Sequence, residues 1–226
     1  MPAFNEEANI ATTIIDARSA AQQLTKDFEI IVVDDGSTDR TAEVVKELAH
    51  GDERISLIQH KANLGYGSAV KTGLKACKKD WIFFTDSDGQ FHSDELPKFA
   101  ESFDKYDLII GYRKKRMDPF HRVFVAQVLL KIWNYLLFKL KVRDVDCAFK
   151  LFKKEVRDAI ELDTSSAITV TEFIVKSQIL GYKLVERPVH HFPRKFGEQT
   201  GGNWRVILKA AKESLVLHQK INYDEI

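Results

Sequence analysis

Three polar side chains follow the apolar segment Trp81–Thr85, and their types suit a divalent cation. Asp86 and Asp88 stand two residues apart, and Gln90 follows two residues later. In a turn, the two carboxylates and the amide oxygen can converge on one ion and leave positions open for a diphosphate. Hard oxygen ligands of this kind favour Mg²⁺ or Mn²⁺. Because Asp, Ser and Gly are also common turn residues, the alternative is a turn that holds no metal.

A second acidic pair, Asp34 and Asp35, follows the β-branched segment Glu29–Val33. Short apolar runs rich in β-branched residues are typical of strands buried on both faces of a sheet. In open α/β sheets, ligands bind at the carboxyl ends of such strands. We therefore expect both acidic clusters at one edge of a sheet, and this expectation strengthens the metal hypothesis.

The elements that must position these residues alternate between strand-like and helix-like patterns in the first half of the chain. The strand-like segments are Glu29–Val33, Arg54–Gln59, Trp81–Thr85 and Asp107–Gly111. The helix-like segments are Glu6–Leu24, Thr38–His50, Gly65–Cys77 and Ser93–Phe103. This alternation predicts an α/β fold with a mostly parallel central sheet, right-handed crossovers and flanking helices.

The second half of the chain contains fewer strand-like segments. Those with a strand-like pattern are Val145–Phe152 and Lys183–His191, and those with a helical pattern are Lys153–Leu162, Val170–Gly181 and Asn203–Lys220. There is no internal repeat and no linker rich in Pro, Gly or Ser. We therefore expect residues 1–226 to form a single domain.

The chain begins with Met1-Pro2-Ala3-Phe4, at the point where a first strand should end. Strands of such sheets usually have about five or six residues. We therefore expect the first strand to be missing or truncated, through a late start codon, a shortened sequence or a real loss.

The overall composition excludes several classes of protein. The 34 Lys and Arg residues nearly balance the 33 Asp and Glu residues, and a net charge of +1 argues against a nucleic-acid-binding protein. Cys77 and Cys147 cannot form a disulfide framework, so a reducing compartment is expected. There is no run of about 18 apolar residues that would cross a bilayer.

Residues 119–142 combine a wide apolar face with basic side chains and contain no acidic residue. The charged residues in this segment are Arg122, Lys131, Lys139 and Lys141. An apolar and basic helix of this kind, too interrupted to span a bilayer, predicts one or two helices that lie at a membrane interface. The alternative is a helix of the core, although unpaired lysines are rarely buried. Asn203–Lys220 is also amphipathic and would add a second contact.

Several motifs stand in the order and spacing of the family 2 glycosyltransferases. They are Pro2–Glu7, Val33–Asp39, Asn63–Gly67, Asp86–Gln90, Gly111–Arg113, Asp144–Lys150 and His191–Gly197. The chain resembles most closely the polyprenyl-phosphate branch of this family, which includes the dolichyl-phosphate mannose synthases. The resemblance covers nearly the whole chain.

This resemblance implies a GT-A-type fold that binds a nucleotide sugar, with a UDP- or GDP-linked donor. The residues that would contact the donor are Pro2, Phe4, Glu6, Asp34, Asp35, Gly65 and Asp86. Phe4 replaces the Tyr that is common in the family, which keeps a stacking ring but removes a hydroxyl. Asp34 would bind the base, and Asp35 would support the loop.

By the same resemblance, Asp86, Asp88 and Gln90 would hold the metal and the diphosphate, and Arg113 and Arg194 would lie near the phosphates. A cation and fixed guanidinium groups stabilise the negative charge that develops on a diphosphate leaving group. Asp88, Arg113 and Arg194 are therefore candidate catalytic residues. For Arg113 the alternative is a solvated basic loop, because it begins the run Arg113–Arg116.

The sequence also bears on the acceptor. There is no Gln-x-x-Arg-Trp motif of the kind found where the acceptor is a sugar hydroxyl. A phosphate monoester loses its second proton at about pH 6 and is therefore largely dianionic at neutral pH. Such an acceptor needs no strong base to become a nucleophile. Glu172 is the remaining candidate base, and its alternative role is that of an acid in the first turn of a helix.

We therefore expect an inverting transfer of a hexose to a polyprenyl or dolichyl phosphate at the cytoplasmic face of a membrane, with peripheral attachment or a separate membrane-anchor subunit. One alternative is a soluble or glycerolipid hydroxyl acceptor. The other is a non-catalytic subunit that binds a nucleotide sugar.

Overall fold

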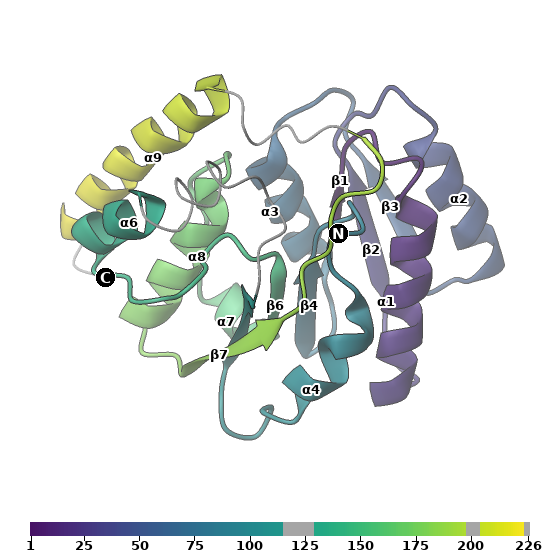
Figure 1. Ribbon diagram of the computed structural model, residues 1–226, viewed down its shortest axis with the longest axis horizontal. Helices are drawn as coiled ribbons and strands as arrows, with labels where there is room; N and C mark the ends of the chain where they lie inside the picture. Colours follow the sequence, from purple (N-terminus) through teal and green to yellow (C-terminus); the bar gives the residue numbers. More distant parts are fainter. Residues whose placement is uncertain (115–128, 198–203, 224–226) are drawn as a thin grey trace.

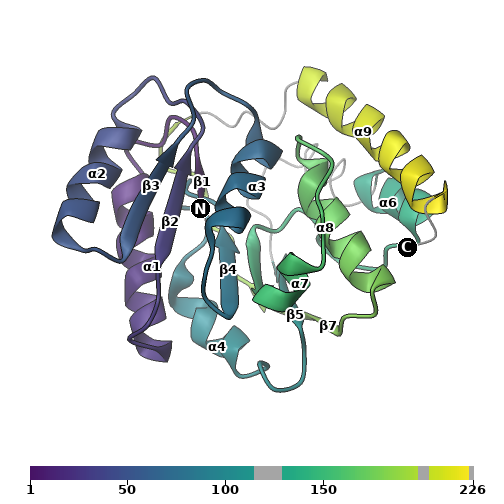
Figure 2. The same cartoon turned by 180° about the vertical axis from the view of Figure 1, so that it is seen from behind.

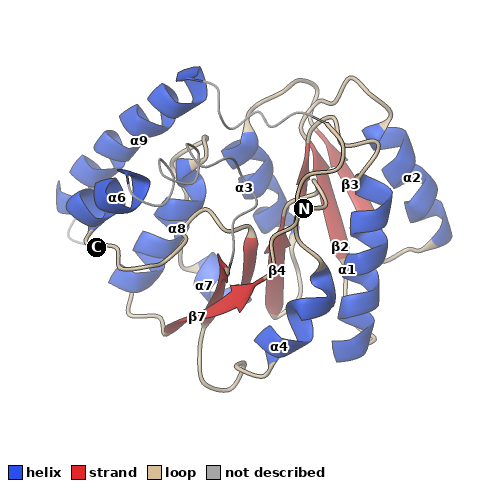
Figure 3. Cartoon of the chain, in the orientation of Figure 1, coloured by secondary structure: helices blue, strands red, loops and turns tan. Residues whose placement is uncertain are grey.

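The computed structural model describes residues 1–114, 129–197 and 204–223. Within these ranges the strands form two sheets, with the orders β1-β2-β3 and β4-β6-β5-β7 (Figures 1 and 3). The strands are β1 (Pro2–Ala3), β2 (Ile30–Asp34), β3 (Ile55–Gln59), β4 (Trp81–Thr85), β5 (Leu108–Arg113), β6 (Phe149–Lys153) and β7 (Leu184–Val189). The predicted α/β fold is confirmed.

Helices connect and cover these strands (Figure 2). They are α1 (Ile10–Leu24), α2 (Thr41–Gly51), α3 (Tyr66–Ala76), the 3-10 helix η1 (Ser93–Glu95), α4 (Leu96–Ala100), α6 (Leu130–Phe138), α7 (Lys154–Asp158), α8 (Ile168–Ile179) and α9 (Trp204–Tyr223). The first helix begins four residues later than predicted, at Ile10 instead of Glu6. The cause is a turn in which the backbone N–H groups of Asn9 and Ile10 both donate to the carbonyl of Glu6, at 2.9 Å.

The first sheet is parallel, as predicted. All five residues of β2 are buried, in agreement with the β-branched pattern of this segment. The first strand, which we expected to be missing or truncated, is the two-residue strand β1, where Pro2 pairs with Val33 and Ala3 with Asp34. The backbone N–H of Asp35 donates to the Ala3 carbonyl at 2.8 Å and continues this pairing beyond the strand.

The second sheet departs from a purely parallel pattern. Strand β6 lies between β4 and β5 and is antiparallel to both, whereas β7 is parallel to β5. The strand begins at Phe149, four residues later than the predicted Val145. The residues before it form a loop whose Val145 carbonyl accepts a hydrogen bond from the buried Lys150 ammonium at 3.1 Å.

A hydrogen bond joins the end of β1 in the first sheet to the residues just beyond β4 in the second. The Ser87 hydroxyl, just beyond β4, donates to the Pro2 carbonyl of β1 at 2.7 Å. A large core cluster lies on the second sheet, where Phe149 contacts the rings of Phe83 and Phe99. The pairing of β1 with β2 and the bond between Ser87 and Pro2 bring the ends of β1, β2 and β4 together, and the predicted acidic clusters follow β2 and β4 there.

Helices α6 and α9 lie against each other in both views of the molecule (Figures 1 and 2). The Trp133 indole N–H of α6 donates to the Ser214 hydroxyl of α9 at 2.9 Å. The helix predicted within residues 119–142 is shorter where it is described, at Leu130–Phe138, and residues 115–128 lie outside the described ranges. Among the described helices, none has the length and apolar character needed to cross a bilayer.

Candidate active site

The predicted metal-binding residues follow β4, at the edge where β1 and β2 also end. Asp88 accepts a hydrogen bond from the Gln90 backbone N–H at 3.0 Å, which closes a tight turn through Gly89. Asp86 accepts a hydrogen bond from the Tyr66 hydroxyl at 3.0 Å. Sequence reasoning missed Tyr66, because only the fold brings the start of α3 to this turn.

The surroundings of the two carboxylates in this turn make them harder to ionise. Burial, followed by the neighbouring charge of Asp88, raises the pKa of Asp86 to about 7. Burial also raises the pKa of Asp88. A cation bound between these carboxylates would stabilise their ionised forms and lower both pKa values.

The donor set fits a divalent metal only in part. Among the described residues there is no cluster of three His, Cys, Asp or Glu side chains that would hold a metal ion. Asp86 and Asp88 offer hard oxygen ligands, so a Mg²⁺ or Mn²⁺ ion here would need further oxygen ligands from a bound diphosphate and water. This arrangement suits a metal that arrives with a phosphorylated ligand.

Gln90 fastens the C-terminal part of the chain to this turn. Its side-chain N–H donates to the Phe192 carbonyl at 3.2 Å, and its backbone carbonyl accepts a hydrogen bond from the Phe192 N–H at 2.9 Å. The segment after β7 therefore runs beside the start of the chain (Figure 1). This placement delivers Arg194 to the acidic turn.

Arg194 lies between two carboxylates. Its Nη2 atom is 2.6 Å from Glu6 Oε1, and its Nη1 atom is 3.7 Å from Asp88 Oδ2. The other oxygen of Glu6 accepts a hydrogen bond from the Asn9 amide at 2.7 Å, and burial raises the pKa of Glu6. The structure thus places three residues that were predicted separately from distant motifs, Glu6, Asp88 and Arg194, in one charged cluster.

Arg113 does not lie in a solvated basic loop, which was the alternative for this residue, but at the end of β5. Its Nε and Nη2 atoms each donate to an oxygen of Asp144 at 2.7 Å, and both side chains are largely buried. Burial alone would lower the pKa of Arg113, but these bonds outweigh it and raise the pKa. The positive charge of Arg113 partly opposes the rise in the pKa of Asp86 and Asp88, while its fork holds Asp144. Sequence reasoning did not identify Asp144 as the partner.

The acidic pair after β2 shapes the adjacent loops. Asp34 is fully buried, and its two oxygens accept hydrogen bonds from the Ser37 N–H and the Gln59 amide, each at 3.0 Å. Asp35 accepts hydrogen bonds from the backbone N–H groups of Leu64 at 3.0 Å and Gly65 at 2.8 Å. The loop-supporting role expected for Asp35 therefore has a direct structural basis.

The turn between β1 and α1 is tied to the loop before α2. The Asn5 N–H donates to the Ser37 hydroxyl, and the Asn5 side chain accepts a hydrogen bond from the Thr38 N–H, each at 2.9 Å. Pro2 is buried and Phe4 is half-buried. These contacts place Phe4 and the loop after Asp34 at the same end of the sheet.

Glu172 lies inside α8 and is fully buried. Its oxygens accept hydrogen bonds from the backbone N–H groups of Asp163 and Thr164, each at 2.9 Å, and from the Thr164 hydroxyl at 2.7 Å. It also pairs with Lys176 at 2.7 Å. These contacts give Glu172 a structural role and leave it without the exposure that a base requires.

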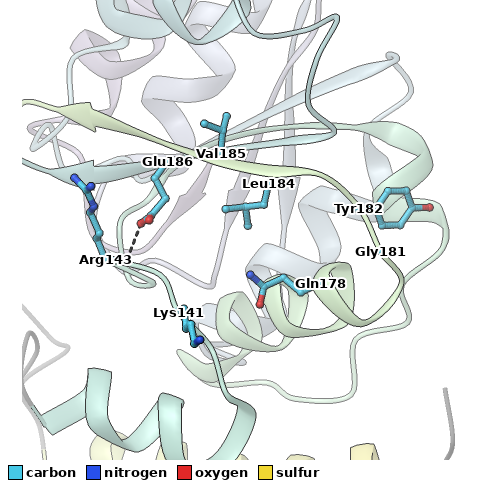
Figure 4. Close-up of a pocket in the computed structure, with 8 residues that line it drawn as sticks. All are labelled: Lys141, Arg143, Gln178, Gly181, Tyr182, Leu184, Val185 and Glu186. Atoms are coloured by element: carbon cyan, nitrogen blue, oxygen red, sulfur yellow. Dashed lines mark hydrogen bonds between the residues drawn. The ribbon is translucent and has the colours of Figure 1, made fainter.

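A cleft of about 700 Å³ lies elsewhere, beside β7, the last strand of its sheet (Figure 4). Its lining residues are Lys141, Arg143, Gln178, Gly181, Tyr182, Leu184, Val185 and Glu186. None of the predicted site residues lines this cleft, so it is separate from the acidic turn.

The model of the family described as "Glycosyl transferase family 2" matches residues 1–160. Solved structures of glucosyl-3-phosphoglycerate synthase from Mycobacterium tuberculosis share the fold at low sequence identity. One, in complex with Mn²⁺, UDP-glucose and phosphoglyceric acid, has a TM-score of 0.74 at 18% identity and covers 96% of this chain and 78% of its own. Another, with Mn²⁺, UDP and phosphoglyceric acid, has a TM-score of 0.71 at 18% identity, with 96% and 74% covered. The family match extends over more than half of the chain and includes both acidic clusters, and it shows that this chain is a glycosyltransferase that belongs to glycosyl transferase family 2.

Proposed function

We propose that this protein transfers a hexose from a nucleoside diphosphate sugar with inversion, in a single displacement that depends on Mg²⁺ or Mn²⁺. The observation that carries the proposal is the turn with Asp86 and Asp88, whose half-buried carboxylates have raised pKa values, and in which Asp88 lies beside Arg194. The bound cation would neutralise charge on the departing diphosphate. Arg194 would then turn its guanidinium group from Glu6 and Asp88 towards the phosphate oxygens, for which its fork is well suited.

The nucleotide would bind at the end of the sheet formed by Phe4, Asp34 and the loop that Asp35 supports. Asp34 is fully buried and its two oxygens accept hydrogen bonds from Ser37 and Gln59, so a base would bind Asp34 only by displacing one of these partners. The M. tuberculosis structures contain UDP or UDP-glucose with Mn²⁺. These complexes support a UDP-linked donor here, with a GDP-linked donor as the other choice.

For the acceptor, we propose a polyprenyl or dolichyl phosphate held at a membrane surface. Helices α6 and α9 expose large apolar side chains next to one another. These side chains are Leu130, Ile132, Tyr135, Leu136, Val206, Ile207, Leu208, Leu215 and Val216. The exposed Lys131, Lys139, Lys209 and Lys212 lie on the same helices or at their ends. An apolar face with basic side chains favours an anionic lipid surface, on the cytoplasmic side in this proposal, with or without a separate membrane-anchor subunit.

The burial of Glu172 supports an acceptor that brings its own nucleophile. A phosphate monoester is largely dianionic at neutral pH and attacks without a base. A hydroxyl acceptor needs a general base within hydrogen-bonding distance of its proton. The contacts of Glu172 therefore favour the phosphate over the hydroxyl.

A second candidate acceptor is a soluble hydroxyl compound, and the solved structures favour it. The M. tuberculosis proteins that share this fold were crystallised with phosphoglyceric acid. At 18% identity, this likeness concerns the fold, and the chemistry of the acceptor must be tested on this chain.

The deciding experiment incubates the purified chain with UDP-glucose or GDP-mannose and Mn²⁺, and offers either a polyprenyl phosphate in detergent micelles or phosphoglyceric acid. Mass spectrometry identifies the product. A glycosylated lipid phosphate supports the main proposal, and glycosylated phosphoglyceric acid supports the second. Donor binding without turnover on either acceptor would favour a non-catalytic subunit.

A further inference from the structure

Tyr66 is the first residue of α3, and its hydroxyl donates to Asp86 Oδ1 at 3.0 Å. Asp86 is one of the two carboxylates assigned above to the cation. A hydrogen bond to one oxygen restricts rotation of the carboxylate and determines which oxygen faces the ion. The position of Tyr66 therefore affects the geometry of Asp86 and Asp88, which we call the metal motif.

Tyr66 lies between two glycines that are in close contact with the backbone before α8. Gly65 has a φ of +97°, and a Cβ atom added there would lie 3.3 Å from the Ser165 carbonyl oxygen. A Cβ atom at Gly67 would lie 2.5 Å from the Ser166 carbonyl oxygen and 2.6 Å from the Ser165 carbonyl carbon. The start of α3 thus rests directly on the Ser165–Ser166 backbone, beside the Thr169 hydroxyl of α8.

Glu213 of α9 holds the other side of this segment. Its Oε2 atom accepts hydrogen bonds from the backbone N–H groups of Ser165 at 3.2 Å and Ser166 at 3.1 Å, and its Oε1 atom accepts one from the Ser165 hydroxyl at 3.1 Å. Burial alone would raise the pKa of Glu213, but the hydrogen bonds from Ser166 and Ser165 outweigh it and lower the pKa. The neighbouring Ser214 and Leu217 are fully buried, so this face of α9 is packed against the protein.

We propose that Glu213 is a positioning residue for the metal motif, acting through Ser165–Ser166 and Tyr66 on Asp86. This inference rests on the proposed function and deepens it. The outer face of α9 carries Ile207 and Leu208, which belong to the apolar surface proposed to meet the membrane. The Glu213 contact therefore connects that surface to the metal motif, and displacement of α9 would change the affinity for metal.

The test measures Mn²⁺ affinity by isothermal titration calorimetry, with the full chain in the presence of saturating UDP or GDP. Glu213→Gln and Tyr66→Phe should each weaken Mn²⁺ binding about 10-fold, at the lower end of the effects seen for groups that orient metal ligands. Glu213 and Tyr66 act on Asp86 along one path, so their effects should not add. The double variant should therefore have the same Mn²⁺ affinity as the single variant that binds Mn²⁺ less tightly.

Ser214→Ala is the matched control, because it removes the hydrogen bond between α9 and Trp133 without touching Ser165–Ser166. Its Mn²⁺ affinity should equal that of the wild type. If Glu213→Gln does not fold, Ser165→Ala removes only the hydroxyl contact with Glu213 and should weaken Mn²⁺ binding in the same direction.

Unchanged Mn²⁺ affinity in a folded Glu213→Gln variant would overturn the inference, as would losses that multiply fully in the double variant. An equal loss in Ser214→Ala would also overturn it, because any loosening of α9 would then have the same effect. If the wild type itself binds no Mn²⁺ with either nucleotide, the proposed function fails, and this inference fails with it.

Discussion

Arg194 and Glu6 are separated by 188 residues in sequence, and their side chains form an ion pair of 2.6 Å beside the acidic turn. The same guanidinium group lies 3.7 Å from Asp88. The pair holds the segment after β7 against the beginning of the chain. It also keeps the positively charged guanidinium group of Arg194 where the diphosphate leaving group would depart.

Replacement of Arg194 should lower donor turnover without loss of the fold. We expect Arg194→Ala to reduce kcat/KM about 100-fold, because a fixed charge at a developing anion contributes on that scale. Arg194→Lys should recover only part of this loss, since an ammonium cannot reproduce the fork. The measurement is steady-state kinetics of donor consumption, with Lys195→Ala as the neighbouring control. A lysine variant with wild-type kcat/KM would argue against a role for the fork.

Asp88→Ala should abolish metal-dependent transfer and leave the protein folded. The side chain supplies one of the two carboxylates assigned to the cation, and its contacts are the turn N–H of Gln90 and the Arg194 guanidinium at 3.7 Å, neither of which belongs to the core. Donor turnover and circular dichroism are measured together, and the exposed Asp94→Ala serves as the control. Full activity in Asp88→Ala would remove the metal assignment.

Asp86→Asn should stabilise the metal-free protein while it removes the response to Mn²⁺. Burial and the neighbouring Asp88 raise the pKa of Asp86 to about 7 in the folded protein, well above the ordinary value of an aspartate, so the folded state favours protonation. The stability of the metal-free wild type should therefore fall as the pH rises from about 4 to 7, and the Asn variant should lack this contribution. At neutral pH we expect a gain of about 1 to 2 kcal/mol, less than the full shift implies because the side chain is partly exposed.

Melting temperatures at several pH values between 5 and 7.5, with and without Mn²⁺, check this prediction. In the wild type, Mn²⁺ with a nucleotide should raise the melting temperature most at the higher pH, where the carboxylates ionise. Parallel pH profiles for the wild type and Asp86→Asn would contradict the assignment.

Glu172→Gln should destabilise the protein and leave kcat of the folded variant unchanged. The substitution removes a fully buried carboxylate that accepts hydrogen bonds from Asp163 and Thr164 and pairs with Lys176. A loss of about 2 kcal/mol in the free energy of unfolding is expected, since buried donors lose an acceptor. Urea denaturation measures the free energy of unfolding. The rate constant kcat is measured separately, without urea, where the variant is folded. A specific loss of kcat in the folded variant would restore Glu172 as a candidate base and favour a hydroxyl acceptor.

The apolar surface of α6 and α9 should bind anionic vesicles. We expect the double variant Ile207→Glu with Leu208→Glu to bind vesicles that contain phosphatidylglycerol at least about 10-fold more weakly. The two glutamates remove apolar contacts with the lipid and introduce negative charges that the anionic headgroups repel. Ile15→Glu is the matched control, since Ile15 is an exposed apolar residue on α1. Co-sedimentation measures binding. Equal losses in both variants, or no binding by the wild type, would contradict the membrane contact.

Much of the fold could be predicted because it depends on local patterns. The β-branched run of β2 and the carboxylates after β2 and β4 follow from neighbouring residues, and strand ends in such sheets meet at one edge. Element boundaries were less predictable. The first helix begins at Ile10 and β6 at Phe149 because the preceding residues form turns held by hydrogen bonds to the backbone.

The sequence by itself determined the α/β class, the position of the acidic turn and, through its ordered motifs, the family. The tertiary structure decided which charges meet: Arg113 with Asp144, Arg194 with Glu6, and Glu172 with the backbone before α8. It also decided that β6 runs antiparallel between β4 and β5. The physical reason is that strand and helix patterns are set by residues a few positions apart, whereas a charged side chain takes its partner from whatever segment the packed core brings beside it.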